Sequence, residues 1–217
     1  MTPTSGSTEQ KTKISMPSGN DFELVGSKIA YQGRVVNVHE ETYRDELGDE
    51  FMREVIHHMG AVSVVPLLSA SQALLVRQWR APLQETILEL PAGKLDVDGE
   101  FPINAANREL REETGYHACF MHHLAAYHSS VGFTDEYSHV YIGMDLVFEG
   151  TERHGPEEEG IQEVVVNLDM VPLMIQDGEI TDGKTIIGLM MAREWLSHYE
   201  GNIPDVSQEF EARQGSS

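Results

Sequence analysis

Residues 93–116 read GKLDVDGEFPINAANRELREETGY, and this stretch combines helix signals with a dense group of acids. Pro102 is a typical first residue of a helix, and Gly115 is a typical residue just past the end of one. The two signals predict a helix over residues 102–115. The acids of this stretch therefore project from a helix rather than from a loop.

Three of these acids, Glu109, Glu112 and Glu113, stand at positions i, i+3 and i+4 and share one face of the expected helix. Like charges at this spacing destabilise a helix by roughly 0.2–0.5 kcal/mol per pair. Helix propensity alone therefore does not favour the cluster unless a cation holds it together. Carboxylate oxygens are hard ligands that suit Mg²⁺ or Mn²⁺. The spacing predicts a divalent-cation site.

The stretch resembles the Nudix box, whose pattern is G-x5-E-x7-R-E-U-x-E-E-x-G-U, where U is a bulky aliphatic or aromatic residue. The match is complete over residues 100–116. Upstream, six residues rather than five separate Gly93 from Glu100, which is a loop insertion that leaves the helical register unchanged. The alternative is a solvated acidic helix with chance spacing, and the number of fixed positions in one window argues against it.

Three other segments resemble the ADP-ribose pyrophosphatase group of this family. They are VRQWR at 76–80 with ELPAG at 89–93, GFTDE at 132–136, and DGKT at 182–185. Together with the box they extend the resemblance over roughly residues 22–200. One departure is Val131, which stands where the group usually has a proline. The loop that follows is therefore free to bend differently, which bears on the choice of sugar.

The resemblance implies an α/β fold, namely an α/β/α sandwich around a mixed β-sheet with an N-terminal β-rich segment. It also implies a homodimer that hydrolyses the diphosphate of ADP-ribose to AMP and ribose 5-phosphate, with Mg²⁺ or Mn²⁺ as cofactor. One alternative is a pyrophosphatase for another nucleoside diphosphate sugar or for a dinucleotide. A second is a non-catalytic nucleotide-sugar-binding module, against which the intact carboxylate set argues.

The resemblance implies site residues as well. The expected metal ligands are the Ala92 carbonyl and the side chains of Glu109, Glu112 and Glu113. Glu100 is expected to bind metal indirectly or to fix its loop, and Arg108 to orient a box carboxylate. The general base is expected in the acidic run Glu157, Glu158 and Glu159, which the sequence cannot separate from a merely solubilising charge run. The expected substrate-binding residues are Arg53, Arg80, Gly132, Phe133, Asp135 and Glu136.

The net charge of the chain limits the kinds of molecule that it is expected to bind. The formal net charge of the 217 residues is −21, which disfavours nucleic acid because phosphate backbones are bound through clustered Lys and Arg. A small diphosphate is repelled too, unless cations and local arginines invert the potential; Arg53, Arg77 and Arg80 are candidates. The longest apolar stretch, 61–68, is interrupted by Ser63 and Pro66, so no membrane segment is expected. The single cysteine, Cys119, favours a reducing cytoplasm.

The chain is long enough for one domain with a sizeable core. Polar composition predicts mobile tails over residues 1–20 and 204–217. Between them we expect an N-terminal β-rich segment over 21–60, which is a candidate for dimerisation, and a hydrolase domain over 61–203. The expected strands are 22–39, with Gly33 as a turn or bulge candidate, and 51–58, 61–68, 73–79, 85–90, 122–129, 139–148 and 162–167. The expected helices, besides the box helix, are about 170–176 and about 184–199.

Two further patterns are interpreted as non-functional. Residues 178–185 satisfy the P-loop expression GxxxxGKT, but they follow an expected helix rather than a buried strand. Asp182 is instead expected to cap the last helix. The histidine doublets at 57–58 and 122–123 fall on strands, where neighbouring side chains point to opposite faces, so neither doublet is expected to chelate a metal with both rings.

Overall fold

The computed structural model describes residues 22–33, 36–153 and 159–215. The chain divides between Val55 and Ile56 into two compact units, each with its own sheet. The boundaries expected from composition, 21–60 and 61–203, remain a prediction.

The first unit is a three-stranded sheet in the order β1 (Glu23–Gln32), β2 (Asn37–Arg44) and β3 (Glu50–His57). β1 and β2 are antiparallel. The expected strand segment 22–39 forms two strands, because the chain turns after β1, where the turn candidate Gly33 donates its N–H to the Val36 carbonyl over 2.9 Å.

The second unit contains a seven-stranded mixed sheet with the path β10-β5-β4-β9-β8. Its strands are β4 (Ala61–Ser69), β5 (Gln72–Arg80), β6 (Glu85–Glu89), β7 (Ala92–Lys94), β8 (Tyr116–His128), β9 (Tyr137–Phe148) and β10 (Gln162–Asn167). β6 pairs with β5, and β7 pairs with β4. The β4–β9 pair is parallel, whereas β5 and β8 run antiparallel to their neighbours.

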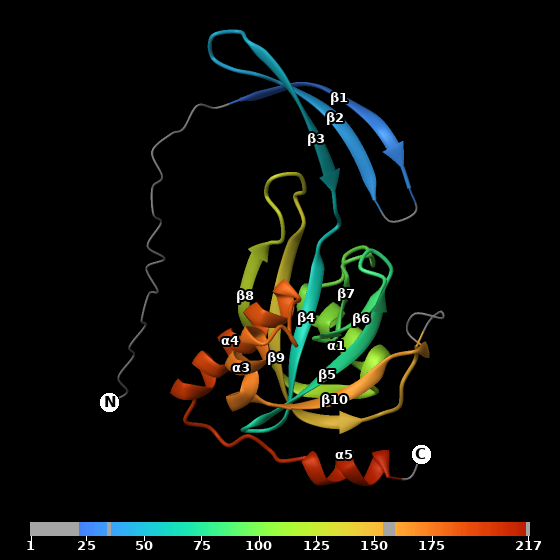
Figure 1. The fold of residues 1–217 in the computed structure, drawn as a ribbon, viewed down its shortest axis with the longest axis vertical. Helices are drawn as coiled ribbons and strands as arrows, with labels where there is room; N and C mark the ends of the chain where they lie inside the picture. The colour runs from blue at the N-terminus through green and yellow to red at the C-terminus, as the bar shows by residue number, and fades with distance from the viewer. Residues whose placement is uncertain (1–21, 34–35, 154–158, 216–217) are drawn as a thin grey trace, which may run out of the picture. The chain divides into compact units, whose positions relative to one another are not determined.

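Helices cover both faces of this sheet (Figure 1). On one face, α1 (Pro102–Thr114) packs through Ala105, Ala106 and Leu110 with the C-terminal helix α5 (Ser207–Gln214). On the other face lie α3 (Val171–Gln176) and α4 (Gly183–His198). The expected α/β/α sandwich around a mixed sheet is confirmed.

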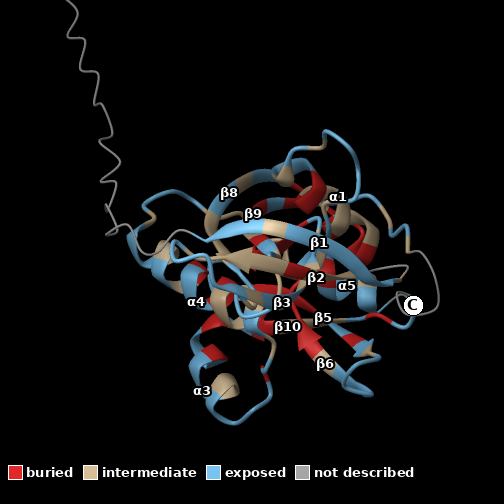
Figure 2. Cartoon of the chain, turned by 90° about the horizontal axis from the view of Figure 1, so that it is seen from above, coloured by how far each residue is buried: buried red, intermediate tan, exposed pale blue. Residues whose placement is uncertain are grey.

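The centre of the sheet is the core of the unit. Every residue of β4 after Ala61 is buried, and so are residues 73–76 of β5 (Figure 2). A strand covered on both faces has no polar side, which is why these two segments are almost continuously apolar. The same property makes them recognisable in the sequence.

The box helix begins and ends where its signals predict. Pro102 is its first residue, and Gly115 follows it in the left-handed conformation with φ 76° and donates its N–H to the Arg111 carbonyl. A Cβ on Gly115 would lie 2.6 Å from the Phe148 ring, so both the backbone conformation and the packing require glycine. Asp182 caps α4, as expected, by accepting the Thr185 N–H.

The expectation of a mobile tail over 204–217 is wrong for residues 207–214, which form α5. Phe210 is buried on the face that α1 covers, and the Arg213 guanidinium lies over the rings of Tyr116, Phe148 and Phe210. Arg213 also forms an ion pair with Glu163 of β10. A helix held by one buried apolar residue and one stacked arginine has no apolar periodicity, so the sequence does not predict it.

Over the part of the chain that the structure describes, none of the helices has the length and apolar character needed to span a membrane.

Candidate metal centre

The box carboxylates gather around one arginine of the same helix. Arg108 Nη1 lies 2.7 Å from Glu109 Oε1 and 3.3 Å from Glu112 Oε2. Its Nη2 donates to Glu100 Oε2 over 3.0 Å, and Asp96 lies 3.7 Å away. The arginine therefore contacts four acids from the helix and from its preceding loop.

The short strand β7 lies directly against this group. A Cβ on Gly93 would be 1.9 Å from the Glu109 carboxyl carbon, so the Glu109 carboxylate occupies the space that any side chain at position 93 would need. One residue earlier, the Ala92 N–H donates to Glu113 Oε2 over 3.1 Å. Ala92 and Gly93 thus contact two of the three clustered glutamates through their backbone.

The electrostatics of the group favour a cation. Burial raises the pKa of Glu109, and the nearby charges of Glu112 and Asp96 raise it further, although Arg108 opposes them. The hydrogen bonds and charges of Glu100 and Glu109 raise the pKa of Arg108 above its ordinary value. Carboxylate oxygens on one helix face with surplus negative charge are donors of the kind that a hard divalent cation prefers. The residues present therefore fit the expected Mg²⁺ or Mn²⁺.

A second network of charges adjoins the centre. The buried Glu89, at the end of β6, accepts two hydrogen bonds from Arg80, Nε to Oε1 at 2.6 Å and Nη2 to Oε2 at 2.8 Å. Lys184 of α4 donates to the same carboxylate. Burial raises the pKa of Glu89, but the Arg80 hydrogen bonds and the Lys184 charge outweigh burial and leave this pKa below its ordinary value. Glu89 is therefore ionised between two cations.

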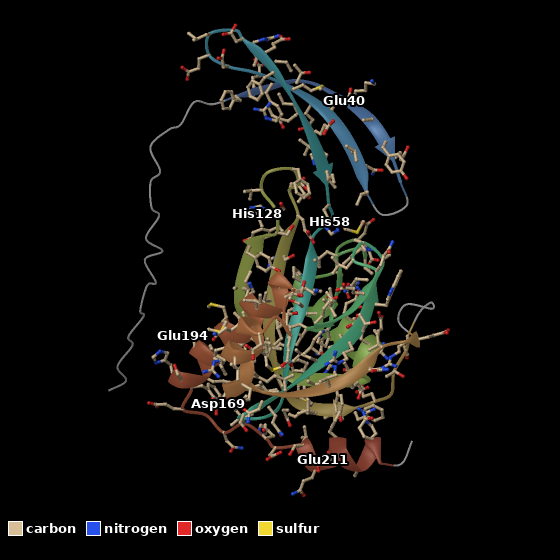
Figure 3. The ribbon with its side chains drawn as sticks, in the orientation of Figure 1. Glu40, His58, His128, Asp169, Glu194 and Glu211 are labelled. Carbon is tan, nitrogen blue, oxygen red and sulfur yellow. The ribbon has the colours of Figure 1, made fainter. Side chains whose placement is uncertain are left out.

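Residues 56–58, the first of the second unit, form hydrogen bonds with the loop after β8. The Ile56 N–H donates to the Phe133 carbonyl over 2.8 Å, and His58 (labelled in Figure 3) donates its N–H to Asp135 Oδ1 over 2.8 Å. His57 Nδ1 lies 2.7 Å from Asp135 Oδ2. Desolvation raises the pKa of Asp135, but these hydrogen bonds outweigh it and lower the pKa. Val131 is 80% exposed, so the position that lacks the proline makes few contacts.

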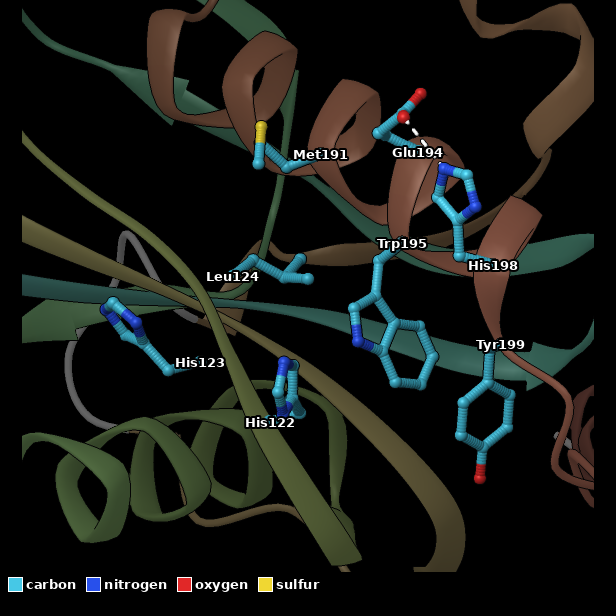
Figure 4. Close-up of a pocket in the computed structure, with 8 residues that line it drawn as sticks. All are labelled: His122, His123, Leu124, Met191, Glu194, Trp195, His198 and Tyr199. Atoms are coloured by element: carbon cyan, nitrogen blue, oxygen red, sulfur yellow. Dashed lines mark hydrogen bonds and ion pairs between the residues drawn. The ribbon is translucent and has the colours of Figure 1, made fainter. Parts of the chain in front are cut away.

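A separate cavity of about 320 Å³ opens between β8 and α4 (Figure 4). Trp195 stacks on Tyr199 there with ring centroids 4.3 Å apart, and His122 lies 5.3 Å from Trp195. His123 contacts His139 and Tyr141 instead, so the two rings of this doublet do not converge, as the strand pattern predicted. Glu194 is the one acid of the lining, which has no Lys or Arg and does not suit a diphosphate.

The comparison with known proteins bears on this geometry. The NUDIX domain profile matches residues 57–186. This chain belongs to the NUDIX domain family.

Relatives within the NUDIX family cover most of the chain. The ADP-ribose pyrophosphatase of Bacillus subtilis is 36% identical over 163 residues, which are 75% of this chain and 88% of that protein. The methanol dehydrogenase activator of Bacillus methanolicus is 35% identical over 184 residues, 83% and 99% of the two chains. The crystal structure of an ADP compounds hydrolase, 22% identical, has a TM-score of 0.73 and covers 84% of this chain and 97% of its own, which shows the shared fold.

The remaining predicted site residues lie in several places. Arg53 is exposed in the first unit, where Nη1 donates to the Met52 carbonyl. Glu157 and Glu158 fall outside the described residues, and Glu159 is exposed. Their roles, and those of the NUDIX box residues, stay predictions.

Glu89, Lys184 and Arg153 were not among the candidate site residues expected from the sequence, although their networks include Arg80 and Glu113. Arg153 donates through Nε to the Glu113 carbonyl and through Nη1 to the Ile161 carbonyl. The available signal for Glu89 was a charged residue inside the apolar run at 87–90. For Lys184 the signal was the DGKT string, whose partner lies 95 residues away in the chain.

Proposed function

We propose that this NUDIX protein hydrolyses the diphosphate of ADP-ribose to AMP and ribose 5-phosphate in a reaction that requires a divalent cation. The observation that carries the proposal is the junction of the box carboxylates with β7, where the Glu109 carboxylate fills the space beside Gly93 and Glu113 accepts the Ala92 N–H. The relatives named as ADP-ribose pyrophosphatases in Bacillus subtilis and Mycobacterium tuberculosis, 36% and 31% identical, support the choice of substrate.

The proposed ligands of the cation are the carboxylates of Glu109, Glu112 and Glu113 and the carbonyl of Ala92. When bound, Mg²⁺ or Mn²⁺ would neutralise the diphosphate oxygens and acidify the attacking water. Arg108 keeps Glu109 and Glu112 side by side, because its Nη1 contacts both carboxylates. Arg80 would supply a positively charged group where the diphosphate approaches.

The general base is proposed among Glu157, Glu158 and Glu159. Its support is Arg153, which lies just before this acidic run and donates both to Glu113 of α1 and to Ile161 after the run. Arg153 therefore links Ile161, which follows the run, to the helix that carries the proposed metal ligands. A carboxylate delivered from this segment would take the proton of the attacking water.

The substrate loop is proposed to be residues 132–136, with Gly132, Phe133, Asp135 and Glu136 facing the sugar. Arg53 is proposed to reach the substrate from the β-rich segment of a partner subunit in a homodimer. We also propose a cytoplasmic location, which suits a single exposed cysteine.

One second candidate is favoured by a specific observation. The methanol dehydrogenase activator of Bacillus methanolicus matches this chain over 99% of its length. Activation of a methanol dehydrogenase is therefore the alternative, and it would use the same carboxylates on the diphosphate of a dinucleotide.

A substrate panel with product identification tests the proposal. ADP-ribose, other nucleoside diphosphate sugars and NADH are each incubated with the chain and Mg²⁺ or Mn²⁺, and products are separated by chromatography. We expect AMP and ribose 5-phosphate from ADP-ribose as the fastest reaction. Another substrate preferred by at least about tenfold, or 1.4 kcal/mol in transition-state discrimination, would refute the assignment of ADP-ribose.

A further inference from the structure

Glu89 holds the Arg80 guanidinium by one edge. Nε and Nη2 donate to the two carboxylate oxygens in the fork geometry that fixes both the position and the plane of the group. Within the described part of the chain Nη1 makes no hydrogen bond, and the Arg80 side chain is 34% exposed. The remaining donors of this guanidinium are therefore available to a ligand.

The metal centre lies close to this guanidinium. Its hydrogen bond to Glu89 raises the pKa of Arg80, and the charges of Glu113 and Asp182 add to the increase. Glu113 also accepts the N–H of Ala92, which follows Glu89 by three positions. Arg80 thus carries its charge beside a carboxylate proposed to bind the cation.

The first turn of α4 contacts Glu89 and the residue that follows it. Lys184 donates to Glu89, while the buried Thr185 accepts the Leu90 N–H at its hydroxyl oxygen over 2.9 Å. Thr185 donates its hydroxyl to Asp182 Oδ2 over 2.6 Å. Two successive residues of α4 therefore hold two successive residues at the end of β6.

We propose that Glu89 is a positioning residue for the diphosphate site. Its carboxylate holds Arg80 so that the Nη1 edge faces the diphosphate, and Lys184 holds the carboxylate in place. Lys184 also pairs with Asp182 Oδ2 at 3.0 Å, so two acids balance the two cations of this network. Without the Glu89 carboxylate, the guanidinium would lose the two hydrogen bonds that fix its position and plane. The inference rests on the proposed function, since it needs a diphosphate at this centre.

A double-mutant cycle tests the proposal. KM and kcat for ADP-ribose are measured for the wild type, Arg80→Ala, Glu89→Gln and the double variant at saturating Mg²⁺. We expect each single variant to raise KM by about tenfold to a hundredfold, the usual effect of losing a hydrogen bond to a charged group, with kcat changed by less than about threefold. In the Arg80→Ala background, Glu89→Gln should change KM by less than about twofold, because Glu89 acts through Arg80.

Independent effects that multiply in the double variant would overturn the proposal, and so would an unchanged KM in Glu89→Gln. Asp169→Asn is the matched control, since it removes the partner of Arg193 elsewhere on the molecule. It should leave both constants at the wild-type values.

Arg80→Lys keeps the test decisive if Glu89→Gln does not fold. Lysine preserves the charge of this partly exposed position but cannot form the fork, so its KM should match that of Arg80→Ala. A wild-type KM in Arg80→Lys would overturn the positioning role. If the wild type acts on another diphosphate, only the assignment of ADP-ribose is refuted. The double-mutant cycle is then measured with that substrate. Wild-type protein inactive on the whole panel overturns both proposals.

Discussion

Gly93→Ala should disable the metal centre without unfolding the protein. The added Cβ would lie 1.9 Å from the Glu109 carboxyl carbon and 2.2 Å from each of its oxygens. Carbon atoms in ordinary contact are about 3.5–4.0 Å apart, so the carboxylate must move by about 1.5–2 Å. The moving group is the end of a flexible side chain, which means that the backbone does not have to shift.

A misplacement of about 1 Å at a reacting centre reduces rate by about a hundredfold. We therefore expect kcat/KM for ADP-ribose to fall by about a hundredfold or more, with a higher Mg²⁺ concentration needed for half-maximal rate. The melting temperature should stay close to that of the wild type. Initial rates over a Mg²⁺ titration, together with thermal denaturation, measure these quantities.

Gly215→Ala is the matched control. Gly215 has an ordinary helical φ of −75°, and a Cβ there would come no closer than 3.6 Å to its nearest neighbour, the Glu211 carbonyl oxygen. This variant should keep full activity. If Gly93→Ala retained activity within about threefold of the wild type, the close approach of β7 to Glu109 would not matter for function, and the reasoning would be refuted.

Three further predictions address the base, the ion network and the assembly. One of the single variants Glu157→Gln, Glu158→Gln and Glu159→Gln should lower kcat by about 10²–10⁴-fold; changes below about threefold in all three would place the base elsewhere. Ionised Glu89 has a lowered pKa, so the stability it contributes is present at neutral pH and is lost as the pH falls through that pKa. The difference in melting temperature between wild type and Glu89→Gln should therefore shrink between about pH 7 and about pH 3, and a constant difference would contradict the ion network. Sedimentation should show a dimer of the 24.2 kDa chain, whereas monomer alone at micromolar concentration would rule it out.

The parts of the fold that the sequence predicted are those whose signals are local. Pro102 and Gly115 mark the ends of α1, and the apolar runs of β4 and β5 follow from their burial on both faces. β7 and α5 were not predicted. β7 has only three residues, and α5 depends on Phe210 and on the stacking of Arg213, which exist only once the sheet has formed.

The candidate site likewise has a part that local sequence signals predict and a part that depends on tertiary contacts. The spacing of Glu109, Glu112 and Glu113 within one helix was sufficient to predict a cation site. The pairing of Glu89 with Lys184 joins β6 to α4 across 95 residues, and no periodicity links such positions. The same string that resembles a P-loop supplies Lys184 and Thr185, so its residues matter through a tertiary contact rather than through the motif.

AMP release from ADP-ribose by wild type and by Glu113→Gln, compared at saturating Mg²⁺, tests the central claim most directly. The substitution removes one ligand charge and preserves side-chain volume at a position 5% exposed. We predict that the wild type releases AMP and ribose 5-phosphate, and that the folded variant is slower by about a hundredfold or more, since a bound metal supplies several kcal/mol of transition-state stabilisation. Equal rates for the two proteins, or no AMP from the wild type, would contradict the account.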